Sequence, residues 1–355
     1  MKDLVVFYAI LDWGLGHATR SVPVIEGLRA RDCRVIIGGS GNSLSYIRDR
    51  FSGLESHEIP SYAVSYTHSR AWVDISMQVP KINRAIKAEE EWLRNFMCST
   101  KVDAIVSDNC YGMVTDQVPS ILITHQLDLQ IPAALKVLAQ KKLNGHLGRF
   151  RETWIADNPA EPRLAGALSV PPKNHASTYL GILSRFRAPE QPVAVIPHSV
   201  LALVSGPETQ RTQFENDLVS QLQNVRGPAT VVCGLPAENF DEPVGKVRRV
   251  SHMADDQLAE AILQAETLIC RSGYSTLMDL EKLWKRAILI ATPGQPEQEY
   301  LASYHKKLGH HRVCAMHDLP ELLQHADVSK PLQPTREALL DEVLDTFVGD
   351  LISTH

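Results

Sequence analysis

The 355-residue sequence contains no run approaching the roughly 18 apolar residues of a membrane-spanning helix. An apolar run over 4–11 follows the first three residues directly, so we expect no signal peptide. Positive charge is not in excess either: 36 lysines and arginines against 41 aspartates and glutamates give a net charge of −5, which argues against a nucleic-acid binder. These absences predict a cytoplasmic protein whose membrane contact, if any, is peripheral at the inner face.

Motifs for metal and redox chemistry are also missing. The six cysteines include no C-x-x-C pair, so we expect free thiols in a reducing compartment. His305, His310 and His311 lie close in sequence but lack H-x-x-x-H spacing and an accompanying carboxylate. No G-x-S-x-G nucleophile elbow is evident. The sequence therefore predicts neither a metal site nor a bound cofactor.

The composition is 44% hydrophobic and 22% charged, which is typical of a soluble globular protein, and the length suits two domains. Short apolar runs alternate with polar turns and helical stretches, and this alternation predicts an α/β fold with parallel sheets. The runs lie at 4–11, 34–38, 55–59, 103–108, 120–124 and 152–156, and then at 200–204, 229–233, 246–250, 267–270, 287–291 and 312–315. The domains are predicted at 1–170 and 192–334, with a Pro- and Gly-rich linker at 171–191 and a final helix at 335–355.

A glycine-rich turn follows the first predicted strand, with Gly14 and Gly16 just before His17. A dinucleotide site would need a third glycine where Thr19 stands, and a carboxylate after the second strand, where 38–41 has none. NAD and FAD are therefore not expected. The glycines instead allow a substrate to approach the backbone closely, and a histidine of near-neutral pKa can take a proton from an attacking hydroxyl. The alternative is that His17 only caps or packs the helix.

A second turn follows the predicted strand 267–270, where Ser272 and Gly273 begin a helix. The first turn of that helix would present backbone N–H groups and a positive dipole end, which suit a diphosphate. Asp279 lies roughly 9 Å further along the helix, where its carboxylate can accept both hydroxyls of a ribose. An ordinary serine-capped connection is the alternative.

A third turn, at 294–299, opens the next helix with several polar side chains. Ligands of open parallel sheets bind outside the carboxyl ends of the strands, so we expect both turns of this half to face one crevice.

The segments 271–279 and 293–299 resemble the donor-binding half of GT-B glycosyltransferases, specifically glycosyltransferase family 28 and the peptidoglycan N-acetylglucosaminyltransferase group. The resemblance implies two Rossmann-like domains facing across a cleft, with the last helix crossing back to the first domain. It also implies a nucleotide-sugar site, built around Asp279 at the ribose. The implied donor-binding residues are Ser205, Gly206, Arg211, His252, Met253, Arg271, Ser272, Gly273, Tyr274, Ser275, Asp279, Gln295, Gln298 and Glu299. Within this set, Arg211 would offer charge to the phosphates, and His252 and Met253 would meet the nucleobase.

The acceptor side rests on the same resemblance. Gly14, Gly16 and His17 are similar to an acceptor loop, and His125 and Gln126 follow a strand as in this group. In related plant-type transferases an aspartate at the end of such a strand pairs with the loop histidine, and this implies a pairing of Asp108 with His17; a solvated aspartate is the alternative.

The implied activity is metal-independent, inverting transfer of a sugar, from a UDP-sugar, to an unknown acceptor hydroxyl. A binding protein without catalysis, or a UDP-sugar epimerase or hydrolase, stays open. The predicted helix 132–150 is rich in lysine and arginine, which suits a membrane surface, an anionic or lipid-linked acceptor, or simply solvent. The polar and aromatic loop 61–72 could line the acceptor site or lie on the surface.

Overall fold

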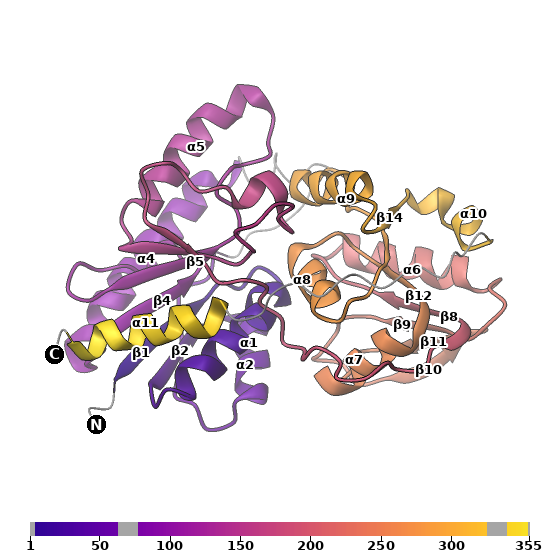
Figure 1. Ribbon diagram of the computed structural model, residues 1–355, viewed down its shortest axis with the longest axis horizontal. Helices are drawn as coiled ribbons and strands as arrows, with labels where there is room; N and C mark the ends of the chain where they lie inside the picture. Colours follow the sequence, from indigo (N-terminus) through magenta and orange to yellow (C-terminus); the bar gives the residue numbers. More distant parts are fainter. Residues whose placement is uncertain (1–3, 63–76, 325–338, 354–355) are drawn as a thin grey trace. The chain divides into compact units, whose positions relative to one another are not determined.

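The computed structural model describes residues 4–62, 77–324 and 339–353. Within these, the chain forms two compact units, one of residues 4–62, 77–185 and 339–353 and the other of residues 186–324 (Figure 1). Each unit contains one largely parallel sheet with helices, which confirms the predicted α/β class. None of the described helices is both long and apolar enough to cross a membrane.

The first unit is built on a parallel sheet of strand order β3-β2-β1-β4-β5-β6-β7. The central strands β1 and β4 are almost wholly buried, as their continuous apolar runs predict. The strands are β1 (Val5–Ile10), β2 (Arg34–Gly39), β3 (Ser56–Glu58), β4 (Ala104–Asp108), β5 (Ser120–Thr124), β6 (Glu152–Ile155) and β7 (Ser177–Tyr179). The helices are α1 (Leu15–Arg29), α2 (Gly41–Arg50), α4 (Val79–Ser99), α5 (Ala133–Leu147), η1 (Gly166–Ser169) and α11 (Leu339–Ser353).

The second unit has a sheet of order β10-β11-β9-β8-β12-β13-β14, in which only β10 and β11 pair antiparallel. The strands are β8 (Ile196–Leu203), β9 (Ala229–Val232), β10 (Asp241–Val244), β11 (Val247–Val250), β12 (Ala265–Cys270), β13 (Ile288–Leu289) and β14 (Arg312–Val313). The helices are α6 (Gln210–Leu222), α7 (Asp255–Gln264), α8 (Tyr274–Lys282), α9 (Pro296–Leu308), η2 (Met316–Asp318) and α10 (Leu319–Gln324).

The strand registers decide which turns meet. In the first unit Ile10 pairs with Asp108, so the turn after β1 and the end of β4 lie at the same sheet edge. In the second unit Cys270 pairs with both Leu203 and Leu289, which brings the turns after β8, β12 and β13 to one edge. Each unit therefore gathers its predicted site residues at the carboxyl ends of its strands.

Some elements differ from the sequence predictions. β7 lies within the predicted linker 171–191, and residues up to 185 belong to the first unit. The elements β10 and α10 were not predicted. The strands β7 and β10 escaped prediction because both are short edge strands without an apolar run. Most of the predicted loop 61–72 and the start of the predicted final helix lie outside the described residues.

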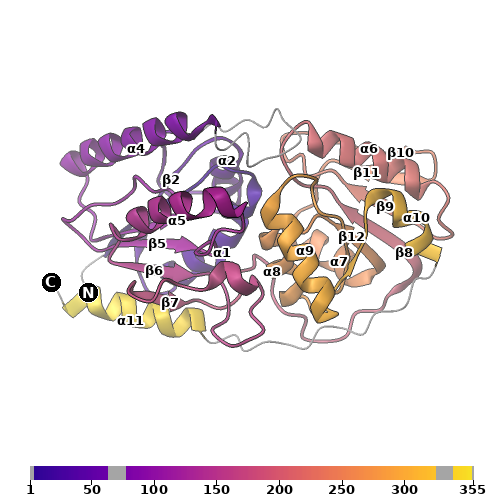
Figure 2. The ribbon, with the colours of Figure 1, turned by 90° about the horizontal axis from the view of Figure 1, so that it is seen from above.

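The C-terminal helix α11 packs onto the first unit, beside α1 and β7, as the resemblance implies (Figures 1 and 2). The ring of Phe347 meets Trp154 edge to face at 5.0 Å. A Cβ on Gly27 would lie 2.4 Å from the Leu344 side chain, so the two helices touch closely at a glycine. Arg31 adds ion pairs to Asp341 and Asp345 on the rim of this contact.

The Phe347→Ala substitution should destabilise the first unit by about 3–5 kcal/mol, because it empties a buried aromatic site. Urea denaturation followed by tryptophan fluorescence would measure the change. As a control, Ile352→Ala on the same helix should cost less than about 0.5 kcal/mol, since Ile352 is 62% exposed. Equal effects of the two substitutions would contradict firm packing of α11.

Candidate active site and donor site

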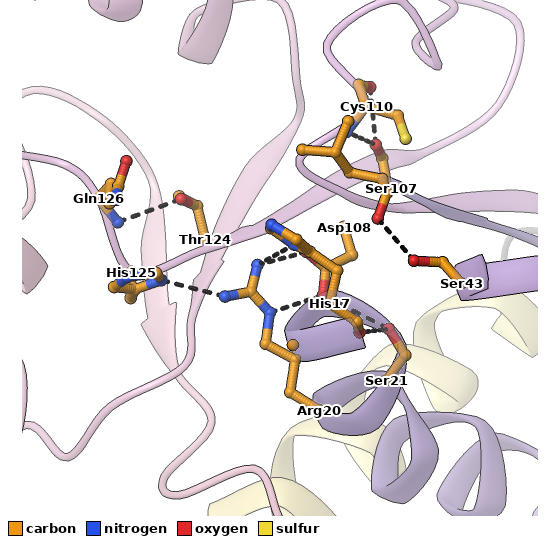
Figure 3. A network of polar contacts seen from close by, with 12 residues as sticks. His17, Arg20, Ser21, Ser43, Ser107, Asp108, Cys110, Thr124, His125 and Gln126 are labelled. Carbon is orange, nitrogen blue, oxygen red and sulfur yellow. Dashed lines mark hydrogen bonds and ion pairs between the residues drawn. The ribbon is translucent and has the colours of Figure 1, made fainter. Parts of the chain in front are cut away.

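His17 lies in the first turn of α1, directly after the glycine turn (Figure 3). Gly14, which precedes the helix, has a φ of 80°, a conformation that favours glycine, although a Cβ there would meet no neighbour within 4 Å. Backbone conformation rather than lack of space is therefore the reason for this glycine. The turn carries the chain from the buried end of β1 into a helix whose first turn presents His17 at the sheet edge.

The His17 side chain contacts Asp108, the last residue of β4. His17 Nδ1 lies 2.7 Å from Asp108 Oδ1, and the histidine side chain is 14% exposed while the aspartate is fully buried. The structure thus brings together the two residues that the sequence analysis paired.

Arg20 completes the cluster from the next turn of α1. Its Nε donates to Asp108 Oδ2 at 2.7 Å and its Nη2 donates to Oδ1, so the guanidinium and the carboxylate form a bidentate ion pair. Arg20 is only 2% exposed. The sequence analysis did not single out this residue; a charged side chain three positions after His17, on the same helix face, was the available signal.

These contacts assign the proton on His17. Arg20 Nη2 also lies 2.9 Å from His17 Nδ1, and both groups point at the same carboxylate oxygen. The ionised carboxylate of Asp108 only accepts, so its 2.7 Å contact with His17 Nδ1 places the ring hydrogen on Nδ1, and Arg20 Nη2 then donates to the carboxylate and not to the ring. His17 Nε2 then keeps its lone pair and can accept a proton from a substrate.

His125, directly after β5, takes the opposite arrangement. Arg20 Nη1 lies 3.0 Å from His125 Nδ1, and because an arginine only donates, Nδ1 of His125 is the acceptor in this contact. The neighbouring Gln126 bonds through its backbone N–H to Thr124 Oγ1 at 3.1 Å. Arg20 therefore links both predicted acceptor-side histidines to Asp108.

The charges in this cluster hold it in one protonation state. Burial alone would raise the pKa of Asp108, but the charge of Arg20 and the contact with His17 outweigh it and hold that pKa well below its usual range. Burial and the Arg20 charge lower the pKa of His17, against an opposing pull from Asp108. His17 is therefore a neutral imidazole at neutral pH.

In the second unit, the two predicted donor turns are joined to each other. Ser272 Oγ donates to the backbone oxygen of Gln298 at 2.8 Å, and Arg271 Nη1 donates to the carbonyl of Ala291 at 3.0 Å. The guanidinium of Arg271 also stacks on the Phe214 ring, 3.6 Å from its centroid, and burial lowers its pKa to about 10. The turn after β12 and the turn after β13 thus form one rigid surface.

Several predicted donor side chains are already engaged in holding these turns. Gln298 Oε1 accepts from the Thr292 backbone N–H at 2.9 Å, and Glu299 Oε1 accepts from the Gly294 N–H at 2.8 Å. Tyr274 and Asp279 are buried on α8, with 3% and 9% exposure. Ser205, Gly206, His252, Met253, Gly273, Ser275 and Gln295 keep partly or largely exposed positions at the same sheet edge.

Arg211, which was predicted to offer charge to the phosphates, forms ion pairs within the second unit. Its side chain forms ion pairs with Glu208 and Glu215 and donates to the Cys233 carbonyl at 3.1 Å. Arg249 shares Glu215 at 2.5 Å. The charge of Arg211 is therefore matched within the unit, where it holds α6 against the sheet, and its contact with a phosphate stays a prediction.

A pocket of about 660 Å³ adjoins the turn after β13, with Glu299, Lys306, Cys314 and Leu322 among its lining residues. Its volume falls within the range of small-molecule sites. Across the described ranges, no three histidine, cysteine, aspartate or glutamate side chains are grouped to hold a metal ion.

The Arg20→Met substitution should raise the pKa of His17, because it removes a cation that lowers it. It should also cost about 3–5 kcal/mol of stability, since the buried Asp108 carboxylate loses its partner. A titration of the His17 ring followed by NMR, with urea denaturation, would measure both effects.

Arg29→Met, at an exposed position of α1, is the matched control and should change neither quantity appreciably. An unchanged or lower His17 pKa in Arg20→Met would contradict the assigned network.

Comparison with known proteins finds a family match over part of the chain and structural matches over nearly all of it. Residues 233–338 match the glycosyltransferase family 28 C-terminal domain. No curated protein sequence matches the chain. Many solved structures do match, at low sequence identity.

Three of these structures span nearly the whole chain. The glycotransferase of kitacinnamycin is 14% identical, with a TM-score of 0.63, covering 99% of this chain and 96% of that one. MurG of Acinetobacter baumannii is 15% identical, with a TM-score of 0.54, covering 98% and 100%. The spinosyn rhamnosyltransferase SpnG, complexed with thymidine diphosphate, is 15% identical, with a TM-score of 0.59, covering 98% and 92%. The chain therefore has the two-domain GT-B fold, and its residues 233–338 are similar to the glycosyltransferase family 28 C-terminal domain.

Proposed function

We propose that the protein transfers a sugar from a UDP-sugar, bound by the second unit, to an acceptor hydroxyl activated by His17 of the first unit. The observation that carries the proposal is the His17–Asp108–Arg20 cluster, in which a neutral imidazole is held by a buried, ionised carboxylate. Such a pair is suited to general-base catalysis, because the carboxylate stabilises the imidazolium that forms.

The proposed step is a single displacement. His17 Nε2 takes the proton of the acceptor hydroxyl while that oxygen bonds to the anomeric carbon of the sugar. The bond between that carbon and the diphosphate oxygen breaks, and the nucleoside diphosphate leaves with the bonding electrons. Attack opposite the leaving group inverts the anomeric configuration.

For the departing diphosphate, the first turn of α8 is the proposed binding group. Gly273 is the N-cap of this helix and has no side chain, and a Cβ there would lie 4.0 Å from its nearest neighbour, Thr276 Oγ1. Backbone N–H groups and the positive helix end stabilise developing negative charge, which supports a reaction that needs no metal ion.

For the base of the nucleotide, a pyrimidine is the proposed choice. The neighbours SpnG and VinC are complexed with thymidine diphosphate and dTDP. Uridine and thymidine diphosphates share the pyrimidine edge that would meet the exposed His252 and the half-buried Met253. Direct competition between UDP and dTDP would distinguish them.

A peripheral membrane contact, which would suit a lipid-linked acceptor, is proposed for α5. Val137 and Leu138 are 79% and 75% exposed at the beginning of this helix, while Leu143 and Leu147 further along it pack into the core. Exposed apolar side chains next to lysines are typical of interfacial helices. The Val137→Glu, Leu138→Glu double variant should lose co-sedimentation with vesicles of mixed anionic and neutral lipids. Equal sedimentation of both proteins would remove this proposal.

The test of the catalytic proposal is His17→Ala. Loss of a general base should lower turnover by roughly 10²–10⁴-fold, while the affinity for UDP stays within a few-fold, because His17 belongs to the unit that does not hold the donor. UDP release from a panel of UDP-sugars, with and without acceptor alcohols, and calorimetric titration with UDP would measure the two quantities.

His317→Ala serves as the control, since His317 is 83% exposed on the second unit. Retained turnover in His17→Ala would remove His17 as the base. UDP release that does not depend on an acceptor would instead favour a hydrolase, and interconversion of the UDP-sugar an epimerase.

A further inference from the structure

The segment that follows Asp108 has an unusual backbone. Asn109 has a φ of 58°, and the chain reverses immediately after the carboxylate that holds His17. Ser107 closes this reversal, because its Oγ donates to the Cys110 carbonyl at 2.7 Å and accepts from the Cys110 N–H at 3.1 Å. The orientation of Asp108 therefore depends on how residues 109–112 are held.

Two side chains from elsewhere hold the far end of this reversal. The Tyr111 N–H donates to the Tyr62 hydroxyl at 3.0 Å, and that hydroxyl donates to Glu89 Oε2 at 2.8 Å. The Gly112 N–H donates to the same Glu89 oxygen at 2.8 Å. Two successive backbone N–H groups are thus fixed in a closed ring of three hydrogen bonds.

The contact between α4 and this segment is very close. A Cβ on Gly112 would lie 2.2 Å from the Ile86 carbonyl oxygen and 2.6 Å from Glu89 Cβ. Only a glycine at position 112 allows this segment to pack against α4, and this packing brings the Gly112 N–H within hydrogen-bond distance of Glu89. Any shift of the Glu89 side chain has to move the backbone of residues 111–112.

The ring fits a protonated Glu89. Glu89 is fully buried, and its Oε1 has no hydrogen-bond partner among the described residues. Whereas Arg20 pairs with Asp108 and Arg211 with Glu215, Glu89 has no arginine or lysine partner in the part of the chain described. Burial raises the pKa of Glu89 to about 8, so the neutral carboxyl offers one doubly bonded oxygen to two donors.

The other titratable groups around Glu89 are two side chains with raised pKa values and the neighbouring acidic side chain of Glu90. Burial raises the pKa of Tyr62 and of Cys110 well above their usual values, and Glu90 is the next residue on the same helix. Asp108 lies beyond Cys110 and is paired with Arg20. Ionisation of Glu89 would place an anion among groups that include no cation within the described residues.

We propose that Glu89 and Tyr62 are positioning residues, whose hydrogen-bond ring fixes residues 109–112 and thereby aims the Asp108 carboxylate at His17. The inference rests on the proposed function for its effect on turnover, but the ring itself is tested without a substrate. Neither residue touches the reacting atoms; both act through the backbone that follows β4.

The test compares Glu89→Leu, Glu89→Gln and Tyr62→Phe by NMR of the His17 ring, alongside turnover. Glu89→Leu removes the shared acceptor and should shift the His17 Nδ1–H signal, with turnover lowered by roughly 10²-fold as expected for a misplaced catalytic group. Glu89→Gln keeps an oxygen acceptor and should restore the wild-type signal. Tyr62→Phe removes only the hydroxyl and should shift the signal in the same direction. This variant provides the test if Glu89→Leu does not fold.

Glu91→Leu is the matched control, because Glu91 is exposed on the same helix. The Tyr111 and Gly112 amide signals should also show a titration step near pH 8 that Glu89→Gln lacks. Folded Glu89→Leu and Tyr62→Phe proteins with an unchanged His17 signal would overturn the inference. A shifted signal in a protein that transfers no sugar would support the ring and reject the proposed function.

Discussion

The arrangement of side chains at the carboxyl edge of the first unit's sheet depends on the buried carboxylate of Asp108. A full negative charge at the end of a central strand is stable only with matched partners, and Arg20 and His17 supply them from consecutive turns of α1. The same contacts fix the position of α1 on the sheet, the tautomer of His17 and, through Arg20, the orientation of His125. The ion pair between Asp108 and Arg20 therefore serves both the stability of the first unit and the proposed chemistry of His17.

The second unit is organised on a different principle. Its polar turns use their own side chains for support: Ser272 binds the Gln298 backbone, Gln298 binds the Thr292 backbone, and Glu299 binds Gly294. Backbone N–H groups and the end of α8 are then the rigid elements of the surface. A diphosphate is well suited to such a surface, because it needs several donors at fixed positions and little side-chain adaptation.

Much of the fold could be predicted from the sequence, because buried parallel strands are continuous apolar runs and glycine turns mark their ends. The pairing of His17 with Asp108 was implied by the resemblance to plant-type transferases, in which a strand-end aspartate pairs with a loop histidine. Arg20, Glu89 and Tyr62 were missed, since their partners are set by strand register and helix packing, which one sequence does not display. The ion pairs of Arg211 with Glu208 and Glu215 were not foreseen for the same reason, since these partners meet it only once α6 has formed.

A thermal-shift measurement with UDP, dTDP, GDP, ADP and NAD, in the presence of EDTA, tests the central claim most directly. A ligand that binds only the folded state stabilises it by mass action, by about 2.7 kcal/mol at a hundredfold excess over Kd. The account predicts that UDP, with dTDP as its nearest competitor, raises the midpoint without a metal ion, and that NAD does not. Stabilisation by NAD and by none of the nucleoside diphosphates would contradict it.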